Sequence, residues 1–287
     1  KSPTVSTPVP KTSICQSKSA SQRRQELKIE KAIKSLSRAV EDKNKASMCK
    51  ALNKLNKLCG RVQLKECFKC LEPAFDIVLS MLSSSFTSDV QKQAFELLSL
   101  FMRVDALRTL LVESHEFVDV LHEHLKSVNR YKTLVSGWSL MATIASQFPL
   151  HFDNAKFLQD ISQSLMKTTI FLHAKRVAPL IRSLLNILKA FLSLQCRNSG
   201  KPAPSELIDA VESVMNCAKN HQVNATIQTQ ACEIVYLSIS NCRTGFVRET
   251  YFKTMYSLAL YTMTFPPTKA VDALDIGARL LSTLLRI

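Results

Sequence analysis

Two groups of side chains in this sequence have the residue types needed to bind a metal ion or to transfer protons. The first is Cys67 and Cys70, whose Cys-x-x-Cys spacing suits a zinc site or a redox pair, with Cys59 eight residues before Cys67. No second pair of Cys or His residues follows at a usual distance, and Phe68 and Leu71 give this segment the pattern of a core helix. We therefore predict neither a metal site nor a redox site here.

The second group combines histidines with carboxylates. His122 and His124 are two residues apart, so on a helix they point to different sides and do not bind one ion together. We predict a hydrated helix face rather than a catalytic site. The group consists of Glu113, His115, Glu116, Asp119, His122, Glu123 and His124.

The common motifs of enzymes and nucleotide-binding proteins do not occur in the sequence. It contains no G-x-S-x-G, Walker-type loop, dinucleotide fingerprint or HExxH, and its 5 glycines are isolated from one another. We predict that the protein is not an enzyme and that it binds no cofactor and no metal.

Lysine and arginine residues recur at helical spacing near the N-terminus and form the strongest candidate for binding. Lys50, Lys54, Lys57, Arg61 and Lys65 follow one another at steps of four, three, four and four residues, which places them on one helix face. Two lysines of the preceding loop, Lys43 and Lys45, extend this row. A second row on the preceding helix contains Lys28, Lys31, Lys34 and Arg38. The first row, with its two loop lysines, is named the basic ridge and consists of Lys43, Lys45, Lys50, Lys54, Lys57, Arg61 and Lys65.

The excess positive charge is concentrated in the same part of the chain. Residues 1–70 contain 17 of the 38 basic residues and 5 of the 23 acidic residues, so they carry +12 of the net charge of +15. Such a field attracts acidic protein segments or nucleic-acid phosphates. No aromatic side chain is interleaved with the lysines, which argues against stacking on bases. The alternative is a solvated surface that keeps an end repeat soluble.

The helix that must organise the fold is expected at residues 174–196. Apolar side chains cover most of its circumference, and Arg182, Asn186, Lys189 and Ser193 form one narrow polar stripe. Because polar residues recur at every turn, a membrane span is excluded. We expect this helix at the centre of a stack of helices.

Twelve helices are predicted, and they form six antiparallel pairs. Gly60 is expected to end the second helix, Pro73 to bend or split the third, and a short continuation through Leu107 to follow the fourth. The pairs are 25–41 with 46–59, 64–83 with 88–103, 115–127 with 130–147, 154–172 with 174–196, 205–219 with 223–241, and 245–264 with 267–286.

The pairs begin at intervals of about 39 to 51 residues, near the period of HEAT and armadillo repeats. Over about residues 25–286 the chain resembles the HEAT/armadillo class of helical-repeat proteins in period, helix pairing and leucine pattern. We predict an all-α, right-handed helical-repeat solenoid of about six antiparallel helix pairs. Residues 1–22 are predicted to be a flexible linker rich in Ser, Thr, Pro and Lys, and 23–287 the repeat domain, with 197–204 a candidate boundary within it.

The resemblance includes the TOG family, in which six such helix pairs bind tubulin through the turns within the pairs. The tryptophan of that family's first turn is absent, because Lys43 and Asn44 stand there and Trp138 lies within a later helix. The turn surface implied by the resemblance would contain Phe86, Arg130, Tyr131, Lys175 and Arg176.

The 9 cysteines are an odd number, scattered through apolar helical patterns, unlike the framework of a secreted disulfide-rich protein. We find no signal peptide and no spanning segment in the sequence. We therefore predict reduced thiols, an intracellular protein of the nucleus or of the cytoplasm and cytoskeleton, and no membrane partner.

These observations favour a non-catalytic scaffold that binds a protein partner with an acidic segment. The partner would bind on the concave face of the solenoid or at its basic end, because stacked pairs expose extended surfaces. Tubulin binding by the turn surface and nucleic-acid binding by the basic ridge are the alternatives. The sequence leaves the oligomeric state open.

Overall fold

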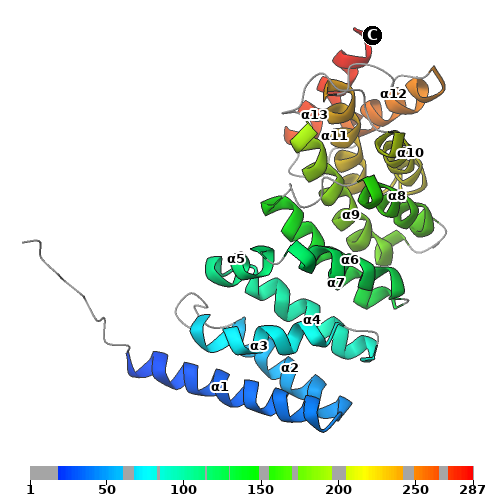
Figure 1. The fold of residues 1–287 in the computed structure, drawn as a ribbon. Coiled ribbons are helices and arrows are strands. Elements are labelled where there is room, and N and C mark those ends of the chain that lie inside the picture. The colour runs from blue at the N-terminus through cyan, green and yellow to red at the C-terminus, as the bar shows by residue number, and fades with distance from the viewer. Residues whose placement is uncertain are drawn as a thin grey trace, which may run out of the picture.

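The computed structural model describes residues 19–60, 68–82, 85–113, 115–128, 130–148, 155–169, 174–195, 205–241, 249–264 and 271–286. Within these ranges the chain is all-α, with thirteen helices and no strand. The helices run from α1 at one end of the molecule to α12 and α13 at the other (Figure 1). The predicted fold class is thus confirmed at the level of an all-α protein.

Each of the twelve predicted helices is present in the structure, with ends that differ by a few residues. The additional helix is α5, where the sequence predicts only a short continuation. The helices are α1 (Ala20–Glu41), α2 (Lys45–Cys59), α3 (Phe68–Ser80), α4 (Ser88–Phe101), α5 (Asp105–Glu113), α6 (His115–Ser127), α7 (Tyr131–Gln147), α8 (Ala155–Thr169), α9 (Ala174–Gln195), α10 (Ser205–Asn220), α11 (Ala225–Asn241), α12 (Glu249–Thr264) and α13 (Val271–Leu284).

Successive helices pack as pairs, and the pairs line up in two rows. The pairs are α1 with α2, α3 with α4, α6 with α7, α8 with α9, α10 with α11, and α12 with α13. The second helices form one row, in which α2, α4, α7, α9, α11 and α13 each contact the next. Since α8 packs on α10 and α9 on α11, helices on either side of the candidate boundary pack directly. Residues 197–204 themselves lie outside the described residues.

The long helix α9 lies in the middle of this row and is buried by its neighbours. Ile181, Leu184 and Leu188 have no exposed surface. The helix contacts α7 on one side, α11 on the other, and its own partner α8. An all-round apolar helix requires such an arrangement, because each exposed leucine would forgo roughly 1.5–3 kcal/mol of burial free energy.

Part of the polar stripe of α9 contacts α11. The amide of Gln230 donates to Asn186 Oδ1 at 2.9 Å, and the Lys189 ammonium pairs with Glu233. Asn186 and Lys189 of the polar stripe therefore contact a neighbouring helix. From their residue types alone, they would be expected on a solvated helix face.

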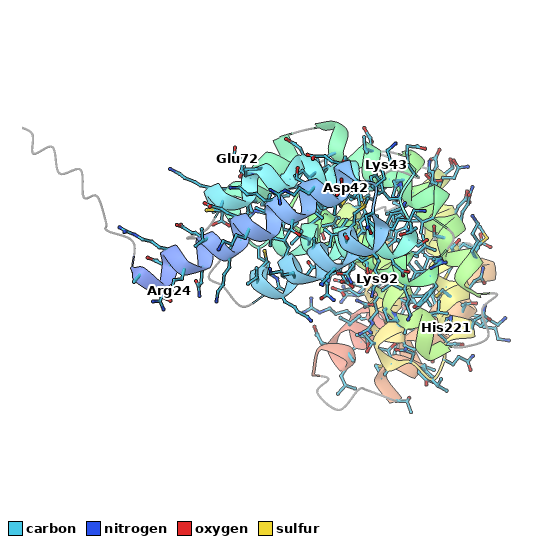
Figure 2. All side chains as sticks on the ribbon, turned by 90° about the horizontal axis from the view of Figure 1, so that it is seen from below. Arg24, Asp42, Lys43, Glu72, Lys92 and His221 are labelled. Carbon is cyan, nitrogen blue, oxygen red and sulfur yellow. The ribbon has the colours of Figure 1, made fainter. Side chains whose placement is uncertain are left out.

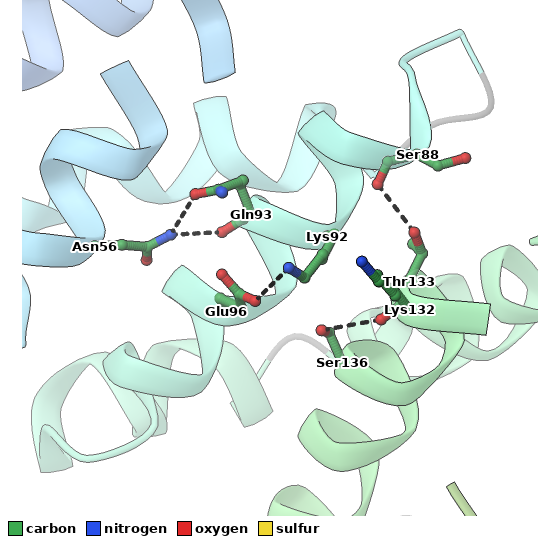
Figure 3. A network of polar contacts seen from close by, with 8 residues as sticks. All are labelled: Asn56, Ser88, Lys92, Gln93, Glu96, Lys132, Thr133 and Ser136. Carbon is green, nitrogen blue, oxygen red and sulfur yellow. Dashed lines mark hydrogen bonds and ion pairs between the residues drawn. The ribbon is translucent and has the colours of Figure 1, made fainter. Parts of the chain in front are cut away.

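Polar side chains also connect α2, α4 and α7 (Figure 3). The amide of Asn56 donates to the backbone oxygen and to Oε1 of Gln93, both at 3.1 Å. The hydroxyl of Thr133 donates to the backbone oxygen of Ser88 at 3.0 Å. Apolar contacts tolerate sliding better than hydrogen bonds, which require a particular distance and angle. We infer that these bonds set the register between neighbouring helices of the row.

The first helix begins earlier than the sequence pattern predicts. The hydroxyl of Ser19 accepts from the backbone N–H of Gln22 at 3.2 Å, and Gln22 Oε1 accepts from the N–H of Ser19 at 2.8 Å. This capping box starts α1 at Ala20, so residues 20–22 are helical and not part of a linker. The remainder of the predicted linker, residues 1–18, lies outside the described residues.

Two further expectations concern helix ends. Gly60 does close α2, with its N–H donating to the backbone oxygen of Asn56 at 2.9 Å. Pro73, in contrast, lies inside α3 and does not split it, so that alternative is wrong. The helix begins at Phe68, only five residues earlier, so the missing N–H of Pro73 removes one bond near the helix start.

No cysteine of the described residues forms a disulfide, and several thiols are inaccessible. Cys59, Cys217 and Cys232 are buried, and Cys49 and Cys70 are half-buried. Burial raises the pKa of Cys217 and of Cys232 to about 12, which keeps both as unreactive thiols at neutral pH. In the same ranges no helix combines the length and the apolar character needed to cross a bilayer.

The central position of α9 predicts a large effect of a single truncation. Leu188→Ala leaves a cavity at a fully buried position of α9, and it should lower the free energy of unfolding by roughly 2–5 kcal/mol. Leu27→Ala, at a leucine that is 51% exposed on α1, should change it by no more than about 0.5 kcal/mol. Urea unfolding followed by circular dichroism measures both, and overlapping curves for the two variants would contradict this role of α9.

Candidate interaction surfaces

The helices α1 and α2 present the basic ridge at one end of the molecule. Their apolar sides are buried, with Ile29 and Leu36 on α1 and Leu52 and Leu55 on α2 fully enclosed. The five described ridge lysines, Lys43, Lys45, Lys50, Lys54 and Lys57, are all exposed. Figure 2 looks onto this end and shows Asp42 and Lys43 at the turn between the two helices. Arg61 and Lys65 lie outside the described residues.

A tight turn fixes the first ridge lysine. Lys43 has a φ of 50°, in the left-handed region that favours glycine. Its N–H donates to the oxygen of Val40, and the N–H of Asn44 donates to the oxygen of Ala39, both at 3.0 Å, which is a Schellman motif. Asn44 also caps α2, since its side chain accepts from the N–H of Ser47 at 3.1 Å. Lys43 thus ends α1, and Asn44 starts α2.

The cations at this end outnumber the neighbouring acidic residues, which include Glu41 and Asp42 at the end of α1. Within the described ranges, none of the five ridge lysines and none of the second row on α1 forms an ion pair. Neither α1 nor α2 has an acidic residue in its first turn, and Lys45 opens α2. Positive charge is unfavourable there, because the N-terminus of a helix is the positive end of its dipole. The positive field of this end is therefore left available to an external anion.

Two open hollows lie among these cations. One, of about 380 Å³, lies at the junction of α1 and α2, and the other, of about 370 Å³, runs along α2. Neither is lined by an aromatic side chain. The first is lined by Lys31, Lys34, Ser35, Arg38, Ala39, Asp42 and Ser47, and the second by Lys50, Asn53, Lys54, Lys57 and Leu58.

A third hollow, of about 530 Å³, lies on the surface between α7 and α9 and is lined mainly by small polar side chains. Its hydroxyls are largely engaged within their own helices. Thr143 donates to the oxygen of Ser139, and Ser193 donates to the oxygen of Lys189. This surface therefore offers a partner less charge and fewer free donors than the α1–α2 end does.

The residues of the predicted turn surface differ in what they present. Phe86 is half-buried and packs against the core, and the buried hydroxyl of Tyr131 has no hydrogen-bond partner in the described part of the chain. Arg130 is exposed and lies 3.7 Å from Asp89. Lys175 and Arg176 lie in the first turn of α9, and their side chains are outside the described residues.

Asp119 and Glu123 of the histidine cluster are exposed, as predicted for a hydrated helix face, whereas for His122 and His124 that prediction was wrong. His122 and His124 are 2% and 9% exposed. The ring of His122 stacks on Phe157 of α8, with centroids 3.9 Å apart, and its Nε2 lies 3.0 Å from an oxygen of Asp160. The ring of His124 instead faces Phe95 of α4, with centroids 6.0 Å apart.

The two histidines thus serve different helix contacts, as expected for positions two apart. The described residues contain no group of His, Cys, Asp and Glu that could hold a metal ion. The side chains of Glu113, His115 and Glu116 and the whole of Cys67 lie outside the described residues. The sequence could not show that α8 packs against this side of α6, because α7 comes between these two helices in the chain.

Comparison with known proteins does not add a family. No protein-family model and no curated protein matches the chain significantly. A crystal structure described as an engineered protein is similar over 90% of this chain and 96% of its own, with 13% sequence identity and a TM-score of 0.44. A likeness at this level supports no conclusion about function.

Two buried histidines make stability depend on pH. Burial lowers the pKa of His124 and of His221, so the unfolded chain binds protons more readily than the folded chain does. The contribution is complete above the unfolded pKa of about 6.5 and is lost as the pH falls below it. The melting temperature should therefore drop between about pH 7.5 and 5.5.

His221→Leu tests this dependence, because neither ring nitrogen of His221 has a hydrogen-bond partner among the described residues. The drop in melting temperature should be smaller in the variant than in the parent protein. Thermal melts by circular dichroism measure it, and equal drops in both proteins would contradict the assignment.

The left-handed backbone conformation of Lys43 predicts that a glycine at this position stabilises the fold. Lys43→Gly removes the Cβ that disfavours this backbone conformation, and it should raise the free energy of unfolding by about 0.5–1 kcal/mol. Lys50→Gly removes the same charge from the interior of α2 and should lower it by about 1 kcal/mol. Urea unfolding of the two variants gives the signs. A destabilised Lys43→Gly protein would show that the turn does not strain its lysine.

Proposed function

We propose that this chain is a non-catalytic protein-interaction scaffold whose α1–α2 end binds an acidic segment of a partner protein. The observation that carries the proposal is the set of five exposed ridge lysines, which have no acidic partner in the described ranges. Concentrated like charges repel one another, and Lys45 at the start of α2 also opposes the helix dipole, whereas Lys57 in the last turn complements it. A partner that neutralises them would relieve this repulsion.

The scaffold is a right-handed helical-repeat solenoid of the HEAT/armadillo type with about six helix pairs. The contact pattern supports this, since each second helix packs on the second helix of the following pair. The insertion of α5 between the second and third pairs lengthens one repeat. An arrangement of this kind presents long surfaces, which suits a protein that binds other proteins.

An acidic protein segment suits the surface better than a nucleic acid does. Lysines that recur once per helical turn match carboxylates at the same spacing on a partner helix, because both rises are about 5–6 Å per turn. The two hollows contain no aromatic side chain on which bases could stack. We place the protein in a reducing compartment, the nucleus or the cytoplasm, because none of its described cysteines forms a disulfide.

Charge reversal tests the proposal. The probe is a synthetic helical peptide with glutamates at intervals of four and three residues, and the variant is Lys50→Glu with Lys54→Glu and Lys57→Glu. The parent protein should bind the peptide in a salt-dependent manner, and the variant should bind it at least about tenfold more weakly. Fluorescence anisotropy of the labelled peptide measures both affinities.

The matched control reverses three exposed lysines elsewhere, Lys132, Lys219 and Lys253, which changes the net charge equally. This control should bind like the parent, and an equal loss in both variants would mean non-specific attraction and would overturn the proposal. Duplex DNA and tubulin serve as competing probes. Tighter binding to DNA of every sequence, with a steep salt dependence, would replace the proposal by nucleic-acid binding.

A further inference from the structure

The hollow at the junction of α1 and α2, of about 380 Å³, is lined by side chains from both helices. Lys31, Lys34 and Arg38 follow one another on α1 at steps of three and four residues, which places them on one side of the helix. Ser35 lies between these cations in the chain, and Ser47 belongs to the first turn of α2. We name this site the junction hollow.

The cations and hydroxyls of the junction hollow have no partners in the described part of the chain. Its three cations are exposed and form no ion pair there. The hydroxyls of Ser35 and Ser47 form no hydrogen bond within the same ranges, although the N–H of Ser47 donates to Asn44. Other helices satisfy such hydroxyls internally, as when Ser193 donates to the oxygen of Lys189. The junction hollow therefore offers several free donors to one ligand.

The junction hollow lies in line with the basic ridge. Ser47, Lys50, Lys54 and Lys57 follow one another at steps of three, four and three residues, so they share one side of α2. The rise from Ser47 to Lys50 is about 4.5 Å, so groups one turn apart on a partner helix reach both positions. A partner segment that lies along the ridge therefore brings one of its ends to the junction hollow.

The hollow along α2 offers a different set of groups. It is lined by Lys50, Asn53, Lys54, Lys57 and Leu58, all from one helix, and it contains neither an arginine nor a hydroxyl. A row of ammonium groups suits a row of carboxylates, as in the proposed function. Convergent donors from two helices instead suit one compact anion with several acceptor oxygens.

The charge of the junction hollow fits a phosphate monoester. Three cations and one acid, Asp42, leave a net charge of +2 in its lining. A phosphorylated serine carries a charge of about −1.5 to −2 at neutral pH and has three strong acceptor oxygens. A carboxylate or the phosphodiester of a nucleic acid carries a single negative charge. Arg38 adds a planar guanidinium, which can donate two parallel hydrogen bonds to one phosphate.

We propose that the junction hollow binds a phosphorylated serine or threonine at one end of the partner's acidic segment. This step rests on the proposed function, because the same segment occupies the basic ridge. Arg38, Lys31 and Lys34 bind the phosphate oxygens, and the hydroxyls of Ser35 and Ser47 donate to those that remain. Phosphorylation of the partner therefore strengthens its binding to the scaffold.

Fluorescence anisotropy with the full chain and three labelled peptides tests the phosphate site. Each peptide has the row of glutamates described above and, one turn beyond it, a phosphoserine, a serine or two glutamates, with both ends of the row tried. The phosphoserine peptide should bind at least about tenfold more tightly than the serine peptide. It should also bind at least about threefold more tightly than the peptide with two extra glutamates, which has a similar charge.

The variant Arg38→Gln should bring the phosphoserine peptide to within about threefold of the serine peptide, because it removes the guanidinium from the site. The matched control is Arg24→Gln, which removes the same charge from an exposed position on α1. Figure 2 shows Arg24 near the start of α1 and Asp42 at its end. The control should keep the preference for phosphoserine.

Three results would overturn the phosphate site. They are equal affinities for the phosphoserine and double-glutamate peptides, equal losses in the two variants, and displacement of the phosphoserine peptide by an equal concentration of single-stranded DNA. If the serine peptide binds and the ridge reversal abolishes this binding, the proposed function stands whatever the phosphate does. If only the phosphoserine peptide binds, the junction hollow stands and the role of the ridge is wrong.

Discussion

The burial of α9 between α7 and α11 is the contact on which the rest of this fold depends. Each second helix is completed by the pair before it and the pair after it, and no pair has enough apolar neighbours by itself. The stability of each pair therefore depends on its contacts with the neighbouring pairs of the row. Within the described residues, the pairs α1–α2 and α12–α13 contact a neighbouring pair on one side only.

The two ends meet this constraint in opposite ways. At α1 and α2 the outward side is basic, and the charges have no partners in the described part of the chain. At α12 and α13 the outward side is apolar. Electrostatic attraction acts over about 8 Å in physiological salt, whereas apolar contacts require close fit. The positive field of the α1–α2 end therefore acts on an anion over a longer distance than an apolar surface acts on a neighbour.

Polar residues inside the helices have a structural role here. Asn56 with Gln93, and Asn186 with Gln230, join successive helices of the long row by amide hydrogen bonds. His122 connects α6 to α8 through Phe157 and Asp160. Residue types that suggest a catalytic or hydrated site therefore serve as contacts between helices, because a repeated stack must set the register of each pair.

The sequence by itself determined the all-α class and the position of every predicted helix. Apolar periodicity depends on local backbone geometry, so it is readable without the fold. It also determined the basic end, because Lys50, Lys54 and Lys57 share a face of one helix. The capping box of Ser19 and Gln22 was not predicted, although its residues are only three apart in the chain, because residues 1–22 were assigned to a linker from their composition.

Only the tertiary structure decided which polar residues are buried. His122 and Asp160 are 38 residues apart in number and meet because α6 and α8 belong to adjacent pairs. The exposure of several apolar side chains on α12 and α13 has the same origin. Tyr256, Leu260 and Leu274 follow the pattern of buried helix residues, and they are exposed because no helix pair packs on the far side of α12 and α13 in the described chain. A periodic pattern identifies an apolar side, but packing decides whether a neighbour covers it.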